Sequence, residues 1–305
     1  MCCLFGFADY VGALSVKQKN RLILELSIAA EARGTDATGI SYNTSRGLQI
    51  YKRPLAAHRL HLRIPAETHV VMGHTRMATQ GSAKKNFNNH PFIGRVKEKP
   101  FALAHNGTIW NDLELRRTKH LPRTKVQTDS FIAVQLIEQQ KSLDFSSLRY
   151  TAEAVEGSFS FTVLSERDDL YLIKGDNPLN IVHFPKVGVY AYTSTTEILN
   201  KALTRCGNWL GRGEKVDIAM GDIVKIDSNG CITRGTFDAS KFYRSSWGYW
   251  DVPLYPKAPH SKEEHLALLK SVAKSFGFTS EMVDRLLDQG FTIDDVENLL
   301  YEGVY

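Results

Sequence analysis

The chain begins Met1-Cys2-Cys3-Leu4-Phe5-Gly6-Phe7, so a cysteine directly follows the initiator methionine. Methionine is generally removed when the second side chain is small, and we therefore expect Cys2 to become the N-terminal residue. Cys2 would then hold a thiol nucleophile and an α-amine that titrates at about 7.7–8.0, close to the pH at which a general base works best. The apolar residues that follow predict a strand that buries and fixes this end. The simpler alternative is that Cys2 is an accident of the start site, because a short motif is weak evidence by itself.

Composition narrows the class of protein. The 305 residues fit one large domain with a small appendage, or two domains, and 43% of them are hydrophobic, which is ample for a core. The net charge of +5 comes without a dense Lys/Arg run, so nucleic-acid binding is not indicated. No apolar run reaches membrane-spanning length, and the N-terminus lacks the pattern of a secretory signal. We expect a cytoplasmic protein that contacts no membrane.

The cysteines argue against a metal site. The four cysteines form no CxxC pair and no ligand-spaced cluster with histidine; they are Cys2, Cys3, Cys206 and Cys231. In a reducing compartment such thiols stay free. We therefore expect no metal and no cofactor.

Strand patterns outnumber helix patterns in the first 240 residues, and most neighbouring elements are joined by short turns. This pattern favours antiparallel sheets with a few covering helices over a doubly wound parallel sheet. The predicted helices are 16–31, 111–118, 131–139 and 196–204, and the predicted strands are 40–43, 48–52, 68–72, 101–104, 158–165, 169–174, 181–184, 187–193, 222–226 and 231–233. We expect Thr128 or Asp129 to cap the helix that starts at Phe131.

The composition changes near residue 240. Residues 241–260 are dense in Tyr, Trp and Pro, which predicts a linker that packs its aromatic side chains on a surface. Residues 261–305 hold three short helical patterns with a shared set of apolar residues, which predict a three-helix module that docks a protein partner or its own parent domain. The expected organisation is a main domain over 1–240, a linker over 241–260 and a helical bundle over 261–305.

Polar loops at strand ends supply the groups that a cysteine nucleophile needs to hydrolyse an amide. Asn106 and Gly107 offer a side-chain amide and a closely approachable backbone N–H for an oxyanion. Arg76 offers a bidentate fork for an α-carboxylate, and Asp129 a carboxylate for an α-ammonium group. Each has a simpler alternative: an ordinary Asn-Gly turn, a surface ion pair and a helix cap.

Several stretches resemble, in the same order, the motifs of one family. The family's Met-Cys-Gly-Ile-Phe-Gly, Arg-Gly-x-Asp-Ser-x-Gly-Ile, Gly-His-Thr-Arg-Trp-Ala-Thr, Asn-His-Pro, His-Asn-Gly and Thr-Asp correspond here to residues 1–6, 33–40, 73–79, 89–91, 105–107 and 128–129. On these motifs the chain resembles the class II glutamine amidotransferases, the N-terminal-nucleophile glutaminase domain of glucosamine-6-phosphate synthase and glutamine phosphoribosylpyrophosphate amidotransferase. The resemblance covers about residues 1–235.

The resemblance implies an α+β fold, a four-layer αββα sandwich with two stacked antiparallel sheets. It also implies that Cys2 attacks the side-chain amide of glutamine and that Asn106 and Gly107 hold the oxyanion. Arg76 and Asp129 would then anchor the amino acid, and Thr79 would line the pocket. His90 matches a family histidine that orders the site, but a packed structural histidine is an equal alternative, and we leave it out of the catalytic set.

Some residues depart from the family. Cys3 replaces a glycine and is expected to face away from Cys2, while Met77 and Gln80 replace a tryptophan and a histidine, which suggests looser closure over the substrate. No acceptor domain follows residue 240, so ammonia would pass to a partner protein or to solution. An amidase acting on another amide and a catalytically silent binding protein remain as alternatives. The sequence does not predict the oligomeric state.

Overall fold

The computed structural model describes residues 2–242, 266, 270, 273, 279–289, 291 and 296. The chain divides into two compact units, residues 1–242 and 243–305, and each is described by itself. Met1 lies outside the described residues, as does the predicted aromatic linker except for Lys241 and Phe242. The removal of Met1 and the role of the linker therefore stay predictions.

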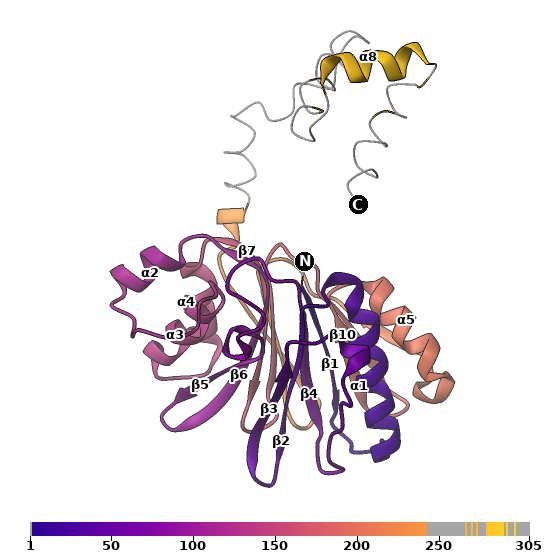
Figure 1. The fold of residues 1–305 in the computed structure, drawn as a ribbon. Helices are drawn as coiled ribbons and strands as arrows, with labels where there is room; N and C mark the ends of the chain where they lie inside the picture. Colours follow the sequence, from indigo (N-terminus) through magenta and orange to yellow (C-terminus); the bar gives the residue numbers. More distant parts are fainter. Residues whose placement is uncertain are drawn as a thin grey trace. The chain divides into compact units, whose positions relative to one another are not determined.

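Two sheets form the centre of the first unit, and every strand pair in them is antiparallel (Figure 1). The first sheet has the order β11 (Glu214–Val216), β9 (Asn180–Phe184), β10 (Val189–Thr193), β1 (Cys3–Asp9), β4 (Val70–Arg76), β2 (Ala37–Thr44) and β3 (Gly47–Arg53). The second has the order β13 (Ile232–Thr236), β12 (Asp222–Ile226), β8 (Leu170–Lys174), β7 (Gly157–Ser165), β6 (Lys99–Ile109) and β5 (Phe92–Val96).

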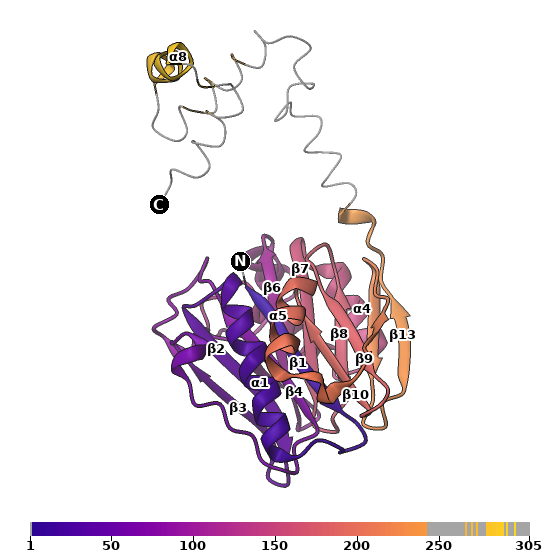
Figure 2. The same ribbon diagram turned by 90° about the vertical axis from the view of Figure 1, so that its right-hand side faces the viewer.

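Helices cover the two outer faces of these sheets. The helices α1 (Val16–Ala30) and α5 (Thr196–Cys206) pack on the first sheet, and α2 (Asp112–Thr118), α3 (Phe131–Gln140) and α4 (Phe145–Ala154) lie on the side of the second (Figures 1 and 2). Short 3₁₀ turns occupy Glu31–Arg33, Ala57–Arg59, Asn86–Asn88 and Asn208–Leu210. The predicted four-layer αββα arrangement is confirmed.

The alternation of side chains along β1 assigns each residue to a layer. Cys3, Phe5 and Phe7 are fully buried in the core under α1 and α5, whereas Leu4 and Ala8 belong to the core between the sheets. Cys3 is therefore a packing residue, as predicted. By the same alternation, the side chain that precedes it, that of Cys2, lies toward the second sheet.

Local sequence accounts for most of the helix starts. Ser15 opens α1 and Asp144 opens α4, each with a capping box in which side chain and backbone bond reciprocally. The predicted cap of α3 is wrong: Ser130 holds the N-cap position, and no side chain caps that helix. The strands β5 and β11 and the helix α4 were not predicted, because β5 is interrupted by Gly94-Arg95 and α4 is rich in Ser and Thr.

One of the three predicted C-terminal helices lies within the described residues. The helix α8 (Ser280–Asp288) begins with a capping box from Thr279, and its Val283 is buried with Ala273 and Val296. Of the other two predicted helices only Leu266, Lys270, Ala273 and Val296 are described, and each of these residues is helical. None of the described helices combines the length and the apolar character needed to cross a membrane.

Candidate active site

Cys2 lies at the start of β1, where the end of β4 and the end of β10 meet it. The Leu4 N–H donates to Ser194 Oγ and the Ser194 N–H donates to the Leu4 carbonyl, both at 2.9 Å, so this end of β1 is fastened to the residue after β10. The Cys2 thiol donates to the Met77 carbonyl across 3.5 Å, and Arg33 Nε donates to the Cys2 carbonyl across 2.8 Å. The predicted nucleophile is therefore held from three directions.

Asn106 and Gly107 lie in β6 of the facing sheet. Asn106 is buried, and its side-chain Nδ2 donates to Ser194 Oγ across 3.4 Å. Gly107 has φ +142°, a conformation that L side chains rarely adopt, and a Cβ there would stand 1.9 Å from the Ser158 carbonyl oxygen. Only glycine fits. The Asn-Gly pair is thus an interior strand feature, not the ordinary turn of the simpler alternative, and Ser194 links it to the strand of Cys2.

Arg76 ends β4 and is buried, with 3% of its surface exposed. Its Nη1 donates to Asn89 Oδ1 at 2.7 Å, and its Nη2 donates to the carbonyls of Gln80 at 2.5 Å and Gly81 at 2.9 Å. These contacts contradict the alternative of a surface ion pair. They fasten the loop that follows β4, and three of the five guanidinium N–H groups are used in doing so.

Gly34 and Asp36, in the Arg-Gly-x-Asp stretch at residues 33–36, contact the backbone at the end of β4 and at the start of the loop that follows it. A Cβ at Gly34 would stand 2.5 Å from the Arg76 carbonyl carbon, so glycine allows the two backbones to touch. The Asp36 N–H donates to the Arg76 carbonyl at 2.9 Å, and Asp36 Oδ2 accepts from the Ala78 N–H at 2.7 Å. This motif therefore shapes the loop and does not itself provide a reacting group.

Asp129 is buried and does not cap α3. Its Oδ2 accepts from the Ile109 N–H at 2.6 Å, and its Oδ1 accepts from the Ser130 hydroxyl at 3.2 Å. Its own N–H donates to Gln80 Oε1 at 3.1 Å. Because the Gln80 carbonyl also accepts from Arg76, one loop residue connects the two predicted substrate-binding charges.

The Cys2 thiol lies in the field of both charges. Burial raises the pKa of Cys2; an interaction with the Met77 backbone and the positive charge of Arg76 oppose this shift, and the negative charge of Asp129 adds to it. A thiol with a raised pKa is protonated at neutral pH, so it needs a base to become a nucleophile. Cys2, Arg76 and Asp129 thus interact electrostatically at one end of the sandwich.

Thr79 is the one predicted site residue that takes no part in the hydrogen-bond network described above. Its side chain is exposed on the loop after β4, and it forms no hydrogen bond with any described residue. Met77 on the same loop is 51% exposed.

His90 is buried beside two further histidines. Its ring centroid lies 4.2 Å from that of His74 and 4.4 Å from that of Phe92, and neither of its ring nitrogens has a hydrogen-bond partner in the described part of the chain. Burial holds the pKa of His90 well below its usual value, so the ring is neutral. His90 directly follows Asn89, whose Oδ1 accepts the hydrogen bond from Arg76 Nη1.

Three residues of the network could not be identified as site residues from local sequence patterns. They are Ser194, Gln80 in its role as a bridge to Asp129, and Asn177, whose Nδ2 donates to the Asn106 carbonyl at 3.1 Å and to Ser158 Oγ at 2.7 Å. A small polar residue at the end of a buried strand is the only hint that Ser194 offers. Among the described residues, no group of three or more His, Cys, Asp or Glu side chains is arranged to hold a metal ion.

Comparisons with known proteins agree on one family. The family described as class-II glutamine amidotransferases matches residues 20–167. The isomerizing glutamine–fructose-6-phosphate aminotransferase of Halalkalibacterium halodurans is 30% identical over 184 residues, which cover 57% of this chain and 29% of that protein. The corresponding protein of Bacillus cereus is 32% identical over 188 residues, which cover 59% of this chain and 30% of that protein. The chain thus spans about a third of the length of these relatives.

Two solved structures share the fold. One, described as the allosteric regulatory enzyme of purine biosynthesis, has a TM-score of 0.62 at 18% identity and covers 78% of this chain and 49% of its own. The other, glutamine phosphoribosylpyrophosphate amidotransferase from B. subtilis complexed with ADP and GMP, has a TM-score of 0.59 at 17% identity with the same coverage. From its motifs, its αββα fold and these matches, the chain contains a class II glutamine amidotransferase domain, a domain of an enzyme family.

Proposed function

We propose that this chain hydrolyses the side-chain amide of glutamine with Cys2 as the nucleophile, and that the ammonia passes to an acceptor on a partner protein or to solution. The observation that carries the proposal is the path from Cys2 through Leu4 and Ser194 to the Asn106 amide, two hydrogen bonds of 2.9 and 3.4 Å. It ties the strand of the nucleophile to the amide that would stabilise an oxyanion. Arg76 and Asp129 act electrostatically on the same thiol.

The chemistry needs a base, because burial keeps the thiol protonated. After removal of Met1, the α-amine of Cys2 takes the thiol proton, and the sulfur attacks the amide carbon of glutamine. The negative charge moves to the amide oxygen, where the second hydrogen of Asn106 Nδ2 and the Gly107 N–H stabilise it. The carbon–nitrogen bond breaks as the amine returns the proton to the leaving nitrogen. This step releases ammonia and leaves a γ-glutamyl thioester, which water hydrolyses to glutamate and the free thiol.

The charges of Asp129 and Arg76 suit the α-ammonium and α-carboxylate groups of the glutamine substrate. Asp129 is buried and aimed by the Ile109 N–H, and it would hold the α-ammonium group. Arg76 would hold the α-carboxylate with the guanidinium N–H groups that the loop leaves unused, or by exchanging a loop carbonyl for the substrate. Thr79 would have to turn inward from its exposed position to line the pocket.

The test measures ammonia and glutamate released from L-glutamine by the purified full chain. Cys2→Ala is expected to abolish release while the circular dichroism spectrum stays unchanged. Cys231→Ser is the matched control, because Cys231 is an exposed free thiol in the β12–β13 hairpin, and it should keep full activity. Intact mass should show loss of Met1, and a glutamine-mimicking alkylator should label Cys2 alone. Activity in the Cys2→Ala protein, or in protein that retains Met1, would contradict the mechanism.

Asp129→Ala tests the amino-acid anchor. A charge-assisted hydrogen bond contributes about 1.5–3 kcal/mol, so we expect the KM for glutamine to rise at least ~10-fold. Asp112→Ala is a matched control, since Asp112 is a buried carboxylate whose 4.0 Å contact is with Arg116 of its own helix. An unchanged KM in the Asp129→Ala protein would remove Asp129 from the site.

A further inference from the structure

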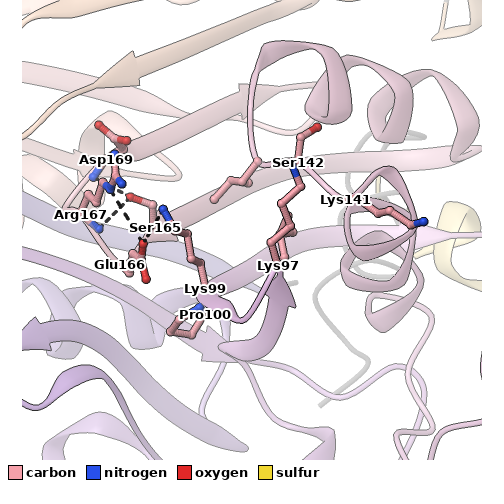
Figure 3. A pocket seen from close by; sticks show the side chains of 11 residues that line it. Lys97, Lys99, Pro100, Lys141, Ser142, Ser165, Glu166, Arg167 and Asp169 are labelled. Carbon is pink, nitrogen blue, oxygen red and sulfur yellow. Dashed lines mark hydrogen bonds and ion pairs between the residues drawn. The ribbon is translucent and has the colours of Figure 1, made fainter.

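A concave site lies at the end of the second sheet away from Asn106. It is a cavity of about 260 Å³ between the β5–β6 turn, the α3–α4 connection and the β7–β8 turn (Figure 3). Along β6 and β7, Phe101 pairs with Ser165 at this end, and Asn106 pairs with Ser160 five residues further on. Five strand residues span about 17 Å, so the cavity is separate from the candidate active site.

The lining of this cavity has an excess of positive charge. Four of its residues are cationic, Lys97, Lys99, Lys141 and Arg167, and two are anionic, Glu166 and Asp169. Asp169 pairs at 2.9 Å with Lys225, a further cation. Within the described chain, Lys97 and Lys141 form no ion pair.

Glu166 marks the position where the cations converge. Its Oε1 lies 3.4 Å from Lys99 Nζ and 3.8 Å from Arg167 Nε, and dashed lines mark these contacts in Figure 3. The Lys99 and Arg167 side chains are 54% and 72% exposed. Ion pairs this exposed contribute little to stability, so a more highly charged anion can replace the carboxylate at the same point.

The rest of the cavity suits a small organic group. Val96, Pro100 and Leu143 supply apolar surface, and the Ser142 hydroxyl has no hydrogen-bond partner within the described residues. The volume is just below the range of about 300–1,000 Å³ that drug-sized ligands occupy. In Figure 3, Lys141 extends away from the Lys99–Glu166–Arg167 cluster, so it lies at the rim.

The turns around the cavity hold charged residues in conformations that favour glycine. Four of the chain's five described non-glycine residues with positive φ lie here: Lys97 at 48°, Glu98 at 66°, Lys141 at 54° and Asp168 at 63°. Backbone strain of this kind concentrates at functional sites. It also means that glycine substitutions in these turns fit the backbone and need not unfold the protein.

We propose that this cavity binds a small phosphomonoester, with the dianionic phosphate between Lys99 and Arg167, Lys97 beside it, and the organic part against Val96, Pro100 and Leu143. A phosphomonoester is largely dianionic at pH 7.5 because its second pKa is about 6. Arg167 and Lys99 supply donors suited to phosphate oxygens.

The test titrates the full chain at pH 7.5 with inorganic phosphate, glycerol 3-phosphate and uncharged glycerol, followed by ligand-observed ³¹P NMR and calorimetry. Glycerol 3-phosphate should bind at least ~3-fold more tightly than inorganic phosphate, and glycerol should not bind. Lys99→Gln and Arg167→Gln should each weaken binding at least ~5-fold, whereas Lys201→Gln on the exposed side of α5 should not change it. Cys2→Ala should bind like the unmodified chain, which separates this site from the proposed glutaminase function.

Three further variants are expected to differ in their effect on the affinity for glycerol 3-phosphate. Glu166→Gln removes the competing carboxylate and should tighten binding about 2–5-fold. Lys97→Gly and Glu98→Gly relieve the same strained turn, but only Lys97→Gly should weaken binding. The proposal is overturned if phosphate does not bind, if glycerol 3-phosphate binds no better than phosphate, if the Lys99 and Arg167 variants bind unchanged, or if Glu166→Gln weakens binding.

Discussion

Ser194 is the residue that connects the strand of the proposed nucleophile, Cys2, to the proposed oxyanion-hole amide of Asn106. Its buried hydroxyl oxygen accepts from the Leu4 N–H at 2.9 Å and from Asn106 Nδ2 at 3.4 Å. Removing this oxygen leaves a buried N–H unsatisfied and releases the Asn106 amide to rotate. In the proposed mechanism Ser194 therefore acts through Asn106, as a positioning residue.

Ser194→Ala is therefore expected to lower kcat about 10-fold, which corresponds to one neutral hydrogen bond of about 1.4 kcal/mol. The KM for glutamine should change less than 3-fold, because Asn106 and not Asp129 is disturbed. Steady-state glutaminase kinetics measure both. Ser41→Ala is the control, since Ser41 is an equally buried serine of β2 whose hydroxyl donates to the Gln49 carbonyl. Equal kcat values for the Ser194 and Ser41 variants would show that Ser194 has only a structural role.

The loop after β4 is the element that connects Arg76 and Asp129, the two charges proposed to bind the substrate. The Gln80 carbonyl accepts from Arg76 Nη2, and its side-chain Oε1 accepts from the Asp129 N–H at 3.1 Å. Asp36 fixes the start of the loop by accepting from the Ala78 N–H at 2.7 Å. Gln80 therefore couples the position of the loop to the position of Asp129.

Gln80→Ala tests this coupling. The loss of one hydrogen bond of about 1 kcal/mol should raise the KM for glutamine about 5-fold, with kcat within 2-fold of its original value. Gln49→Ala is the matched control, because Gln49 bonds only near its own hairpin in β3. A fall in kcat with an unchanged KM would contradict the assignment of Gln80 to substrate binding.

The elements themselves were largely predictable, and their side-chain contacts were not. Alternating apolar residues predicted most strands, and the amphipathic pattern of residues 16–31 predicted α1, which starts at Val16. The predicted cap of α3 was wrong because the Asp129 carboxylate accepts a hydrogen bond from the Ile109 N–H, twenty residues away in sequence and in another element. Ser194 and Gln80 were not predicted as site residues for the same reason. Their hydrogen-bond partners lie 190 and 49 residues away in sequence, and local patterns do not indicate such contacts.

At the scale of the whole molecule, a histidine cluster connects the two sheets. His74 of β4 belongs to the first sheet, and its Nε2 pairs at 2.9 Å with the carbonyl of His105 in β6 of the second. His90 lies beside both, with its ring centroid 4.2 Å from that of His74 in a tilted arrangement and 6.5 Å from that of His105 in an edge-on arrangement. Burial lowers the pKa of His74 from 6.5 to about 3, and it also lowers the pKa of His90 and of His105. All three imidazoles are therefore neutral in the folded protein at neutral pH.

This cluster predicts acid sensitivity of the fold. A histidine in the unfolded chain takes up a proton near pH 6.5, and the folded chain does not do so until a lower pH, so stability is fully present above pH 6.5 and falls as the pH drops toward the folded pKa. From pH 7.5 to 5.5 each histidine that stays neutral in the folded chain contributes a loss of about 1.4 kcal/mol, or about 4 kcal/mol for three. For a domain of this size, the melting temperature should fall by roughly 8–16 °C.

Urea unfolding at several pH values gives the number of protons taken up on unfolding, which should approach three between pH 6 and 5. His90→Leu is expected to lower that number by about one and to preserve the fold, because neither ring nitrogen of His90 has a partner to lose among the described residues. His61→Gln, at an exposed histidine, is the matched control and should leave the number unchanged. Fewer than one proton taken up by the original chain, or an unchanged number in the His90→Leu protein, would mean that the cluster is not held neutral between the sheets.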